Sequence, residues 1–254
     1  MTMMITPTRP KDRILVAIDT PDIDRARALS RDLAGHVGGI KLGLEFFNAH
    51  GPQGVADVAR AERDETPRGE APKGQPLFLD LKYHDIPNTV AGAVRAAMRL
   101  QPSILNVHAS GGPAMMKAAL DAANFEAEAL GTVRPMVIAV TVLTSMDDGD
   151  LAAVGQSAPV SDQVVRLARL TQDSGLDGVV CSAHEIKAIR AACGLDFKLI
   201  VPGIRPAGAD IGDQKRVLTP ADAINAGADF LVIGRPITGA PDPVAAADAI
   251  TADL

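Results

Sequence analysis

The chain has 254 residues, of which 47% are apolar and 22% are charged, and it carries 25 Lys and Arg against 31 Asp and Glu, a net charge of -6. This length fits two ordinary domains or one large single-core fold, and α/β barrels often reach it as one domain. With no Trp, one Tyr and six Phe, Ala, Val, Leu and Ile must fill the core, which argues against a sandwich built on aromatic anchors.

The acidic balance argues against binding of nucleic acid, because proteins that bind it carry a basic face that neutralises phosphates. No apolar run approaches the roughly 20 residues that cross a bilayer, and the polar start of the chain lacks the apolar centre of a signal peptide. We therefore expect a cytoplasmic protein with no membrane partner. Cys181 and Cys193 are too few for a disulfide framework or a zinc site, and we expect plain buried or half-buried thiols.

Eight short apolar runs with turn-forming residues at their ends predict eight strands. In chain order they are 14–18, 39–42, 77–81, 104–107, 136–142, 178–180, 198–201 and 230–233. Because the runs are apolar through their length, both faces of each strand are expected to be covered.

Stretches with apolar residues at helical spacing separate these runs and predict helices. They include 22–34, 89–100, 113–129, 161–174, 183–192 and 220–226. Gly175 and Gly227 each come just before a strand, where glycine accepts the left-handed conformation that ends a helix. The alternation predicts an α/β fold, a closed (β/α)8 TIM barrel.

The whole chain, residues 1–254, is predicted to be a single barrel domain, since no linker divides it. Residues 1–12 form an N-terminal extension before the first strand. Residues 61–76 mix charge, Gly and Pro between the second helix and the third strand. This segment is typical of a surface excursion in contact with solvent.

Charged residues gather at the end of the third predicted strand. Asp80 and Lys82 are two residues apart, so they share a face of the strand, which in a barrel is the lumen. Buried charges without partners are costly, so we expect Lys41, Asp80, Lys82 and Asp85 to interlock and to keep both lysines protonated. A protonated lysine held in place is a proton donor. The alternative, an exposed edge with solvated charges, fits poorly with the apolar residues that precede Asp80.

The last two predicted strands end in glycine-containing turns followed by an arginine, Gly203 with Arg205 and Gly234 with Arg235. Loops at these positions of a barrel often bind phosphate, because glycine lets the backbone approach the anion and a nearby cation neutralises it. The alternative for either arginine is a surface ion pair.

The segment Asp80-Leu81-Lys82-Tyr83-His84-Asp85-Ile86-Pro87-Asn88-Thr89 is a long and specific signature. With it, the chain resembles the orotidine 5′-phosphate decarboxylase family over residues 13–250. Supporting segments are 16–19, 41–45, 107–112, 140–146, 202–205 and 233–238. The resemblance implies a carboxy-lyase of pyrimidine biosynthesis that converts orotidine 5′-phosphate to uridine 5′-phosphate (UMP). It also implies a homodimer with shared active sites and no metal or organic cofactor.

The resemblance also implies roles for the charged residues. Lys82 would protonate carbon 6 of the pyrimidine as carbon dioxide leaves, and Asp80 would lie beside the substrate carboxylate. Lys41 would bridge to Asp80 and the ribose, while Asp85 and Thr89 would come from the partner chain. The implied catalytic residues are Lys82, Asp80, Asp85 and Lys41.

The implied substrate site is wider than this catalytic group. Asp19 would contact the ribose, Thr144 and Ser145 would face the base, and residues 207–216 would close over the phosphate. The full set is Asp19, Lys41, Asp80, Ile86, Thr89, Thr144, Ser145, Pro202, Arg205, Gln214, Gly234 and Arg235, of which Arg205, Gln214, Gly234 and Arg235 would hold the phosphate.

Two other functions remain open. One is a sugar-phosphate decarboxylase or aldolase of the same superfamily, some of which share the Asp-x-Lys-x-x-Asp strand but use magnesium. Residues 86–89 and the turn at 143–145 favour the pyrimidine nucleotide. A non-catalytic barrel that binds a phosphorylated ligand would have no need for buried charges. His84 and His108 lie within the motifs, and we expect structural roles for both.

Overall fold

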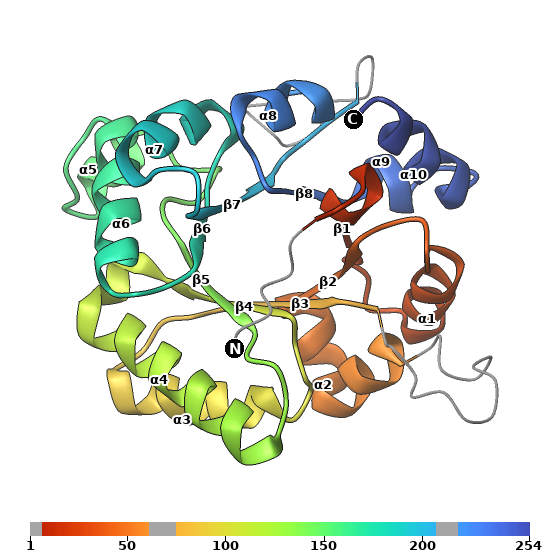
Figure 1. Ribbon diagram of the computed structural model, residues 1–254, viewed down its shortest axis with the longest axis horizontal. Helices are drawn as coiled ribbons and strands as arrows, with labels where there is room; N and C mark the ends of the chain where they lie inside the picture. Colours follow the sequence, from red (N-terminus) through yellow and green to blue (C-terminus); the bar gives the residue numbers. More distant parts are fainter. Residues whose placement is uncertain (1–6, 61–74, 207–217) are drawn as a thin grey trace.

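The computed structural model describes residues 7–60, 75–206 and 218–254. Its eight strands are parallel and pair in chain order, and β8 pairs with β1 to close the barrel. Figure 1 looks down the ring of strands, which the helices surround. The predicted (β/α)8 TIM barrel is confirmed.

The strands lie where the apolar runs predict them, with ends that differ by up to two residues. They are β1 Ile14–Ala17, β2 Gly39–Gly43, β3 Leu77–Tyr83, β4 Ile104–His108, β5 Met136–Val140, β6 Gly178–Val180, β7 Lys198–Pro202 and β8 Phe230–Ile233. The largest differences are at β3 and β5. The first extends into the charged motif, and the second ends before Thr141 and Val142.

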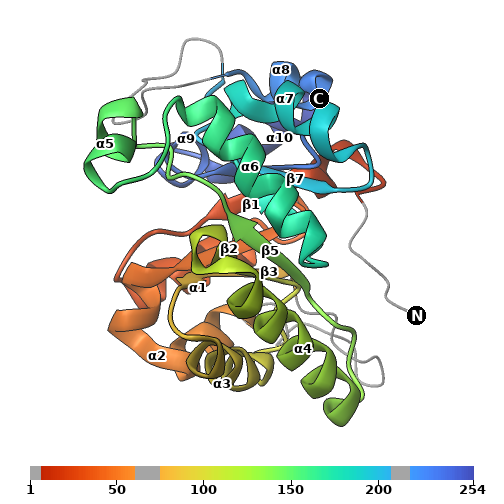
Figure 2. The same ribbon diagram turned by 90° about the vertical axis from the view of Figure 1, so that its left-hand side faces the viewer.

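The helices are α1 Ile23–Asp32, α2 Leu44–Ala59, α3 Pro87–Met98, α4 Gly112–Leu130, α5 Asp148–Ala153, α6 Val160–Asp173, α7 Ile186–Cys193, α8 Pro220–Ala226, α9 Arg235–Thr238 and α10 Pro243–Ala252. Gly175 and Gly227 have φ angles of 85° and 114°, which confirms the predicted left-handed helix ends. The sequence pattern did not indicate α5, α9 and α10, because the first two are short and α10 is rich in alanine without a clear apolar face. Figure 2 shows α3 and α4 side by side on the outside of the barrel. None of the helices in the described ranges is long and apolar enough to cross a membrane.

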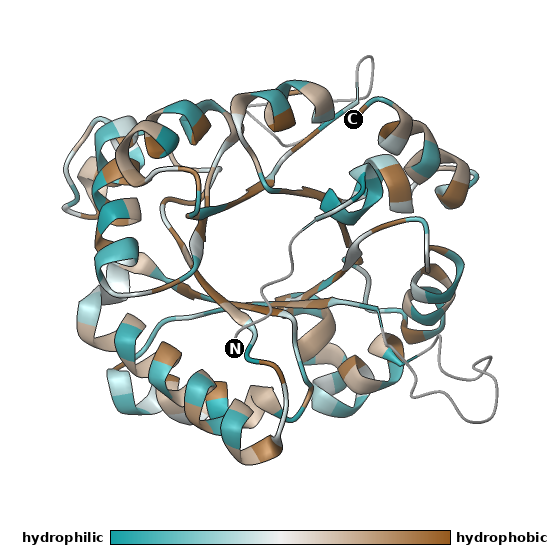
Figure 3. Cartoon of the chain, viewed as in Figure 1, coloured by the Kyte–Doolittle hydropathy of each residue, from teal (hydrophilic) through white to brown (hydrophobic). Residues whose placement is uncertain are grey.

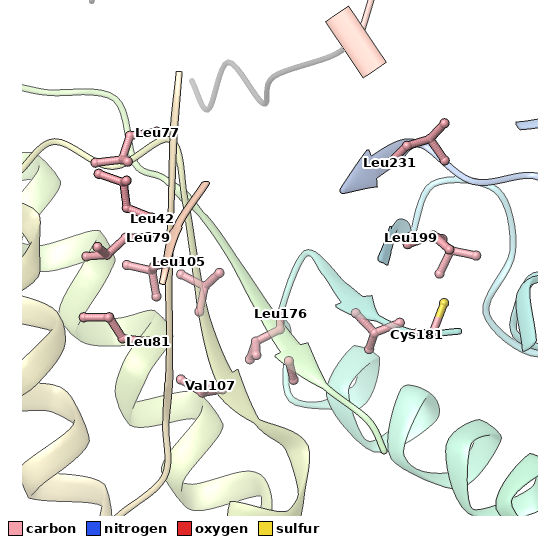
Figure 4. Packing of buried hydrophobic residues seen from close by; sticks show 14 of the residues in the cluster. Leu42, Leu77, Leu79, Leu81, Leu105, Val107, Leu176, Cys181, Leu199 and Leu231 are labelled. Carbon is pink, nitrogen blue, oxygen red and sulfur yellow. The ribbon is translucent and has the colours of Figure 1, made fainter. Parts of the chain in front are cut away.

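Apolar residues pack in two layers, one on each face of the strands. The outer layer lies between strands and helices, and Figure 4 shows Leu42, Leu79 and Leu105 of neighbouring strands within it. The inner layer fills the lumen and includes Phe78, Ile138 and Phe230. In Figure 3 the strands are mostly brown, whereas teal is frequent on the helices. Both strand faces are therefore covered, which explains runs without polar alternation.

Both cysteines are free and buried, as predicted. Most of the predicted surface excursion, 61–74, and residues 1–6 of the predicted extension lie outside the described residues. The prediction is wrong for the end of the excursion. Gln75 is only 9% exposed, and the carbonyl oxygen of Pro76 accepts a hydrogen bond of 2.9 Å from the Ile40 amide. Gln75 and Pro76 therefore already pack against the barrel, just before β3 begins.

Candidate active site

A pocket of about 400 Å³ opens at the carboxyl ends of the strands. This is the end of a TIM barrel where active sites are found, because the loops that follow several strands meet there. The residues that line it are Ala17, Asp19, Lys41, Phe78, Asp80, Lys82, Val180, Pro202, Gly203, Arg205, Val232, Gly234, Arg235 and Thr238. The fold thus brings predicted residues from five strand ends to one cavity.

Four charged side chains form a continuous chain of ion pairs along one wall of this pocket. Lys41 Nζ lies 3.0 Å from Asp19 Oδ1 and 3.4 Å from Asp80 Oδ2, and Lys82 Nζ lies 2.7 Å from Asp80 Oδ1. Strands β1, β2 and β3 are neighbours, with Ala17 opposite Lys41 and Lys41 opposite Phe78. Charged side chains from three separate parts of the sequence therefore lie next to one another, with negative and positive charges alternating along the wall.

The ion pairs set the protonation states of the two most buried members, Lys41 and Asp80, which are 7% and 8% exposed. Burial by itself lowers the pKa of Lys41, but attraction to Asp80 and Asp19 outweighs it, so the pKa lies above its ordinary value. Burial by itself raises the pKa of Asp80, but Lys41, Lys82 and a hydrogen bond from Asn106 outweigh it and lower the pKa. Both groups are therefore charged at neutral pH.

Asp85 does not join this chain of ion pairs within its own subunit. It is exposed, and among the described residues the hydrogen bond that its carboxylate makes is with its neighbour, the Ile86 amide, at 2.6 Å. Strand β3 ends at Tyr83 and the backbone turns into α3, which carries Asp85 away from Asp80. The prediction that Lys41, Asp80, Lys82 and Asp85 interlock is wrong for one chain, where Asp19 is the fourth member.

Several further predicted residues lie outside the pocket. Ile86 and Thr89 are exposed, and Ile86 is 67% exposed. Thr144 is half-buried and Ser145 is exposed, both in the turn after β5. Gln214 and the predicted closing loop 207–216 lie outside the described residues.

The loops after β7 and β8 form another wall of the pocket. Gly203 has a φ of 75°, a left-handed conformation that glycine adopts without strain, and it turns the chain after β7. Arg205 is 8% exposed. Gly234 precedes α9, and the Arg235 side chain that follows it is exposed at the pocket edge. Two cations and two glycines therefore gather where the sequence predicts a phosphate site.

Asn106 on β4 belongs to this wall of ion pairs, although the sequence pattern did not indicate it. Its Nδ2 donates to Asp80 Oδ1 at 2.7 Å, and its Oδ1 accepts from the Lys82 amide at 2.8 Å. The available signal was a single amide within the apolar run 104–107, on the same strand face as Ile104. A polar side chain there needs buried partners, and the third strand supplies them.

Two histidines lie near the wall of the pocket that carries the ion pairs. The rings of His84 and His108 have centroids 5.4 Å apart, and burial, with smaller contributions from His84 and Lys82, lowers the pKa of His108. No group of three or more His, Cys, Asp or Glu residues within the described ranges is arranged to hold a metal ion.

Comparison with known proteins places this geometry in a family. The family model for the orotidine 5′-phosphate decarboxylase / HUMPS family matches residues 12–250. The chain belongs to this family. The orotidine 5′-phosphate decarboxylase of Paramagnetospirillum magneticum is 56% identical over 241 residues, covering 95% of this chain and 97% of that protein. The enzyme of the same name from Rhodospirillum rubrum is 57% identical over 241 residues, covering 95% and 93%.

Solved structures agree with the family membership. The crystal structure of orotidine 5′-phosphate decarboxylase from Lactobacillus acidophilus has a TM-score of 0.79 and 35% identity, and the match covers 94% of this chain and 97% of that one. The relatives named here are carboxy-lyases, and the solved structure shares the fold of this chain.

Proposed function

We propose that this chain decarboxylates orotidine 5′-phosphate to UMP without a cofactor, with Lys82 as the proton donor. The observation that carries the proposal is the chain of ion pairs from Asp19 through Lys41 and Asp80 to Lys82, which lines the same pocket as Arg205 and Arg235. The wall with the ion pairs suits a reaction that develops negative charge, and the wall with the two arginines suits a phosphate.

In the proposed reaction, the bond between carbon 6 and the substrate carboxylate breaks. Its electron pair stays on carbon 6, and carbon dioxide leaves. The Lys82 ammonium stabilises the developing carbanion and transfers a proton to carbon 6, after which the neutral amine takes a proton from water. Asp80 holds the ammonium through its 2.7 Å contact, and Lys41 keeps Asp80 ionised. A preorganised charge needs little rearrangement as the reaction proceeds.

The remaining pocket residues would bind and orient the nucleotide. Asp19 and Lys41 would contact the ribose, and Pro202, Arg205, Gly234 and Arg235 would surround the phosphate end. Interactions remote from the reacting carbon supply binding energy that orients the substrate. Thr144 and Ser145 would face the base from the turn after β5, and Gln214 would join the phosphate contacts.

The proposal includes a homodimer in which Asp85 and Thr89 complete the site of the partner subunit. Support comes from their exposure at the start of α3, at the same end of the barrel as the pocket. Large apolar side chains that follow strands at this end are also exposed, with Leu44 at 50% and Leu143 at 39%. A second copy would bury such side chains and remove them from water.

An absorbance assay of orotidine 5′-phosphate tests the reaction directly. We expect the substrate absorbance to be lost, UMP to form, and the rate to be unchanged by a chelator. No turnover of orotidine 5′-phosphate, together with magnesium-dependent turnover of a sugar phosphate that a chelator abolishes, would favour the sugar-phosphate alternative. Binding of UMP without any turnover of orotidine 5′-phosphate would favour a barrel that only binds phosphorylated ligands.

Mixing two inactive variants tests the shared sites. Lys82→Ala and Asp85→Ala each lack one member of a shared site, but a mixed dimer contains one complete site. Random exchange makes half of the dimers mixed, so activity is expected to recover to about a quarter of the wild-type value. No recovery, in samples shown by mass spectrometry to exchange subunits, would contradict a partner role for Asp85.

A further inference from the structure

Asn106 lies on β4 beneath the charged wall of the pocket, and its exposed fraction is 0%. Its neighbours Leu105 and Val107 belong to the outer apolar layer, where Figure 4 shows both. Because strand residues alternate between faces, Asn106 points toward the lumen. A buried amide is unfavourable unless its donor and acceptor groups are paired. Its partners therefore explain why it is there.

The Asn106 amide contacts two residues of the charged motif, Asp80 and Lys82. Its Nδ2 donates to Asp80 Oδ1 at 2.7 Å, and its Oδ1 accepts from the Lys82 backbone amide at 2.8 Å. The same Asp80 oxygen accepts from Lys82 Nζ at 2.7 Å. The three residues thus form a closed ring of hydrogen bonds in which the amide fixes both ends of the lysine–carboxylate contact.

The backbone at Lys82 needs such a support. Leu79 pairs with Leu105 and Tyr83 pairs with Val107, so four steps along β3 match only two along β4, and the register shifts between them. Lys82 lies within this irregular stretch with a φ of 49°. The left-handed region is disfavoured for residues with a side chain. The Asn106 side chain therefore binds the Lys82 amide where regular pairing between the strands is interrupted.

We propose that Asn106 is a positioning residue for the decarboxylation, which holds the backbone of Lys82 and the carboxylate of Asp80 so that the lysine ammonium meets carbon 6. This inference rests on the proposed function and deepens it. Asn106 is not among the described residues that line the pocket. It acts on the reaction through Lys82 and Asp80, as the supporting shell of a site does.

The first test replaces the amide with a side chain that makes neither hydrogen bond. In Asn106→Ala, kcat is expected to fall by about tenfold to a hundredfold, with the dissociation constant for UMP changed by less than about twofold. The control is Ile138→Val, a lumen residue opposite Asn106 on β5, for which kcat is expected to stay near the wild-type value. A kcat of Asn106→Ala within about twofold of wild type would overturn the proposal.

A second variant separates positioning from general packing. In Asn106→Asp, a carboxylate would lie beside Asp80, and two adjacent carboxylates share a proton as the pH falls. The protonated side chain again has one donor and one acceptor, so it restores both hydrogen bonds. The ratio of its kcat to that of Asn106→Ala should therefore rise toward acid pH.

The other groups that titrate or carry charge near this position are Lys41 of β2, Asp80 and Lys82 of β3, and His108 of β4, whereas β5 places Ile138 opposite. These groups are common to both variants, so the ratio reports the substituted side chain. A ratio that does not change with pH would overturn the proposal. If Asn106→Ala fails to fold, the ratio of Asn106→Asp to wild type gives the same test.

A structural readout keeps this inference distinct from the proposed function. If wild-type protein does not turn over orotidine 5′-phosphate, the proposed function fails. The crystal structure of Asn106→Ala still tests the positioning. We expect the Lys82 φ to leave 49° and the contact from Lys82 Nζ to Asp80 Oδ1 to lengthen beyond 2.7 Å. An unchanged geometry would show that Asn106 does not position Lys82.

Discussion

Lys82→Ala is the most informative perturbation, because it removes both the proposed proton donor and a positive charge from the pocket. Loss of a positioned general acid typically costs about 10²–10⁴ in rate. The energy that the positive charge contributes can be estimated from its contact with Asp80. Two unit charges 2.7 Å apart attract by about 6 kcal/mol at an effective dielectric constant of 20. The Lys82 side chain is 30% exposed, so water screens part of this attraction. For a carbanion at a similar distance we therefore use a stabilisation of about 4 kcal/mol, which corresponds to about a thousandfold in rate.

Together these effects predict a kcat lower by about 10⁵–10⁷. The absorbance assay measures turnover, and calorimetry with UMP shows whether the pocket still binds nucleotide. Lys82→Arg separates the contributions, since arginine keeps the charge but does not release its proton. Its kcat should lie between those of wild type and Lys82→Ala. Lys187→Ala, at an exposed position on α7, is the matched control. A Lys82→Ala enzyme within about tenfold of wild type would refute the proton-donor assignment.

Two other predictions concern the phosphate and the pH dependence of stability. Arg235→Ala should raise KM for orotidine 5′-phosphate by about tenfold to a hundredfold with a smaller change in kcat, and an unchanged KM in steady-state kinetics would remove Arg235 from the phosphate site. The ion pair with Arg9 lowers the pKa of Asp12 to about 2 from 3.8. Its stabilisation is therefore complete above the unfolded pKa and is lost as the pH falls through the folded pKa. The difference in melting temperature between wild type and Asp12→Asn should be small, since Arg9 is exposed, and should shrink between about pH 5 and pH 2. A difference that grows toward acid pH would contradict this sign.

Local sequence patterns were sufficient for the barrel. Apolar runs such as 230–233 coincide with strands, because a strand covered on both faces must be apolar throughout. Gly175 and Gly227 marked helix ends because few other residues adopt a positive φ at low cost. The sequence pattern did not predict helix α10, because its alanines give no face that is clearly apolar.

The charged wall could be predicted only in part. Asp80 and Lys82 share a strand face, so their contact follows from spacing. Asp85 also carries charge near that strand, yet its place depends on where β3 ends and the chain turns, which the spacing does not encode. Asn106 is separated from Lys82 by 24 positions, and only the pairing of β3 with β4 brings them together.

The sequence by itself determined the class of fold and the kinds of chemical groups at the strand ends, because strand alternation and buried charges leave local patterns. The tertiary structure decided which charges touch. Within one chain it made Asp19, and not Asp85, the fourth member of the ion-pair chain, and it revealed Asn106 as the support of Lys82. Contacts between strands depend on register and on irregularities such as the one at Lys82, and these arise only when the barrel closes.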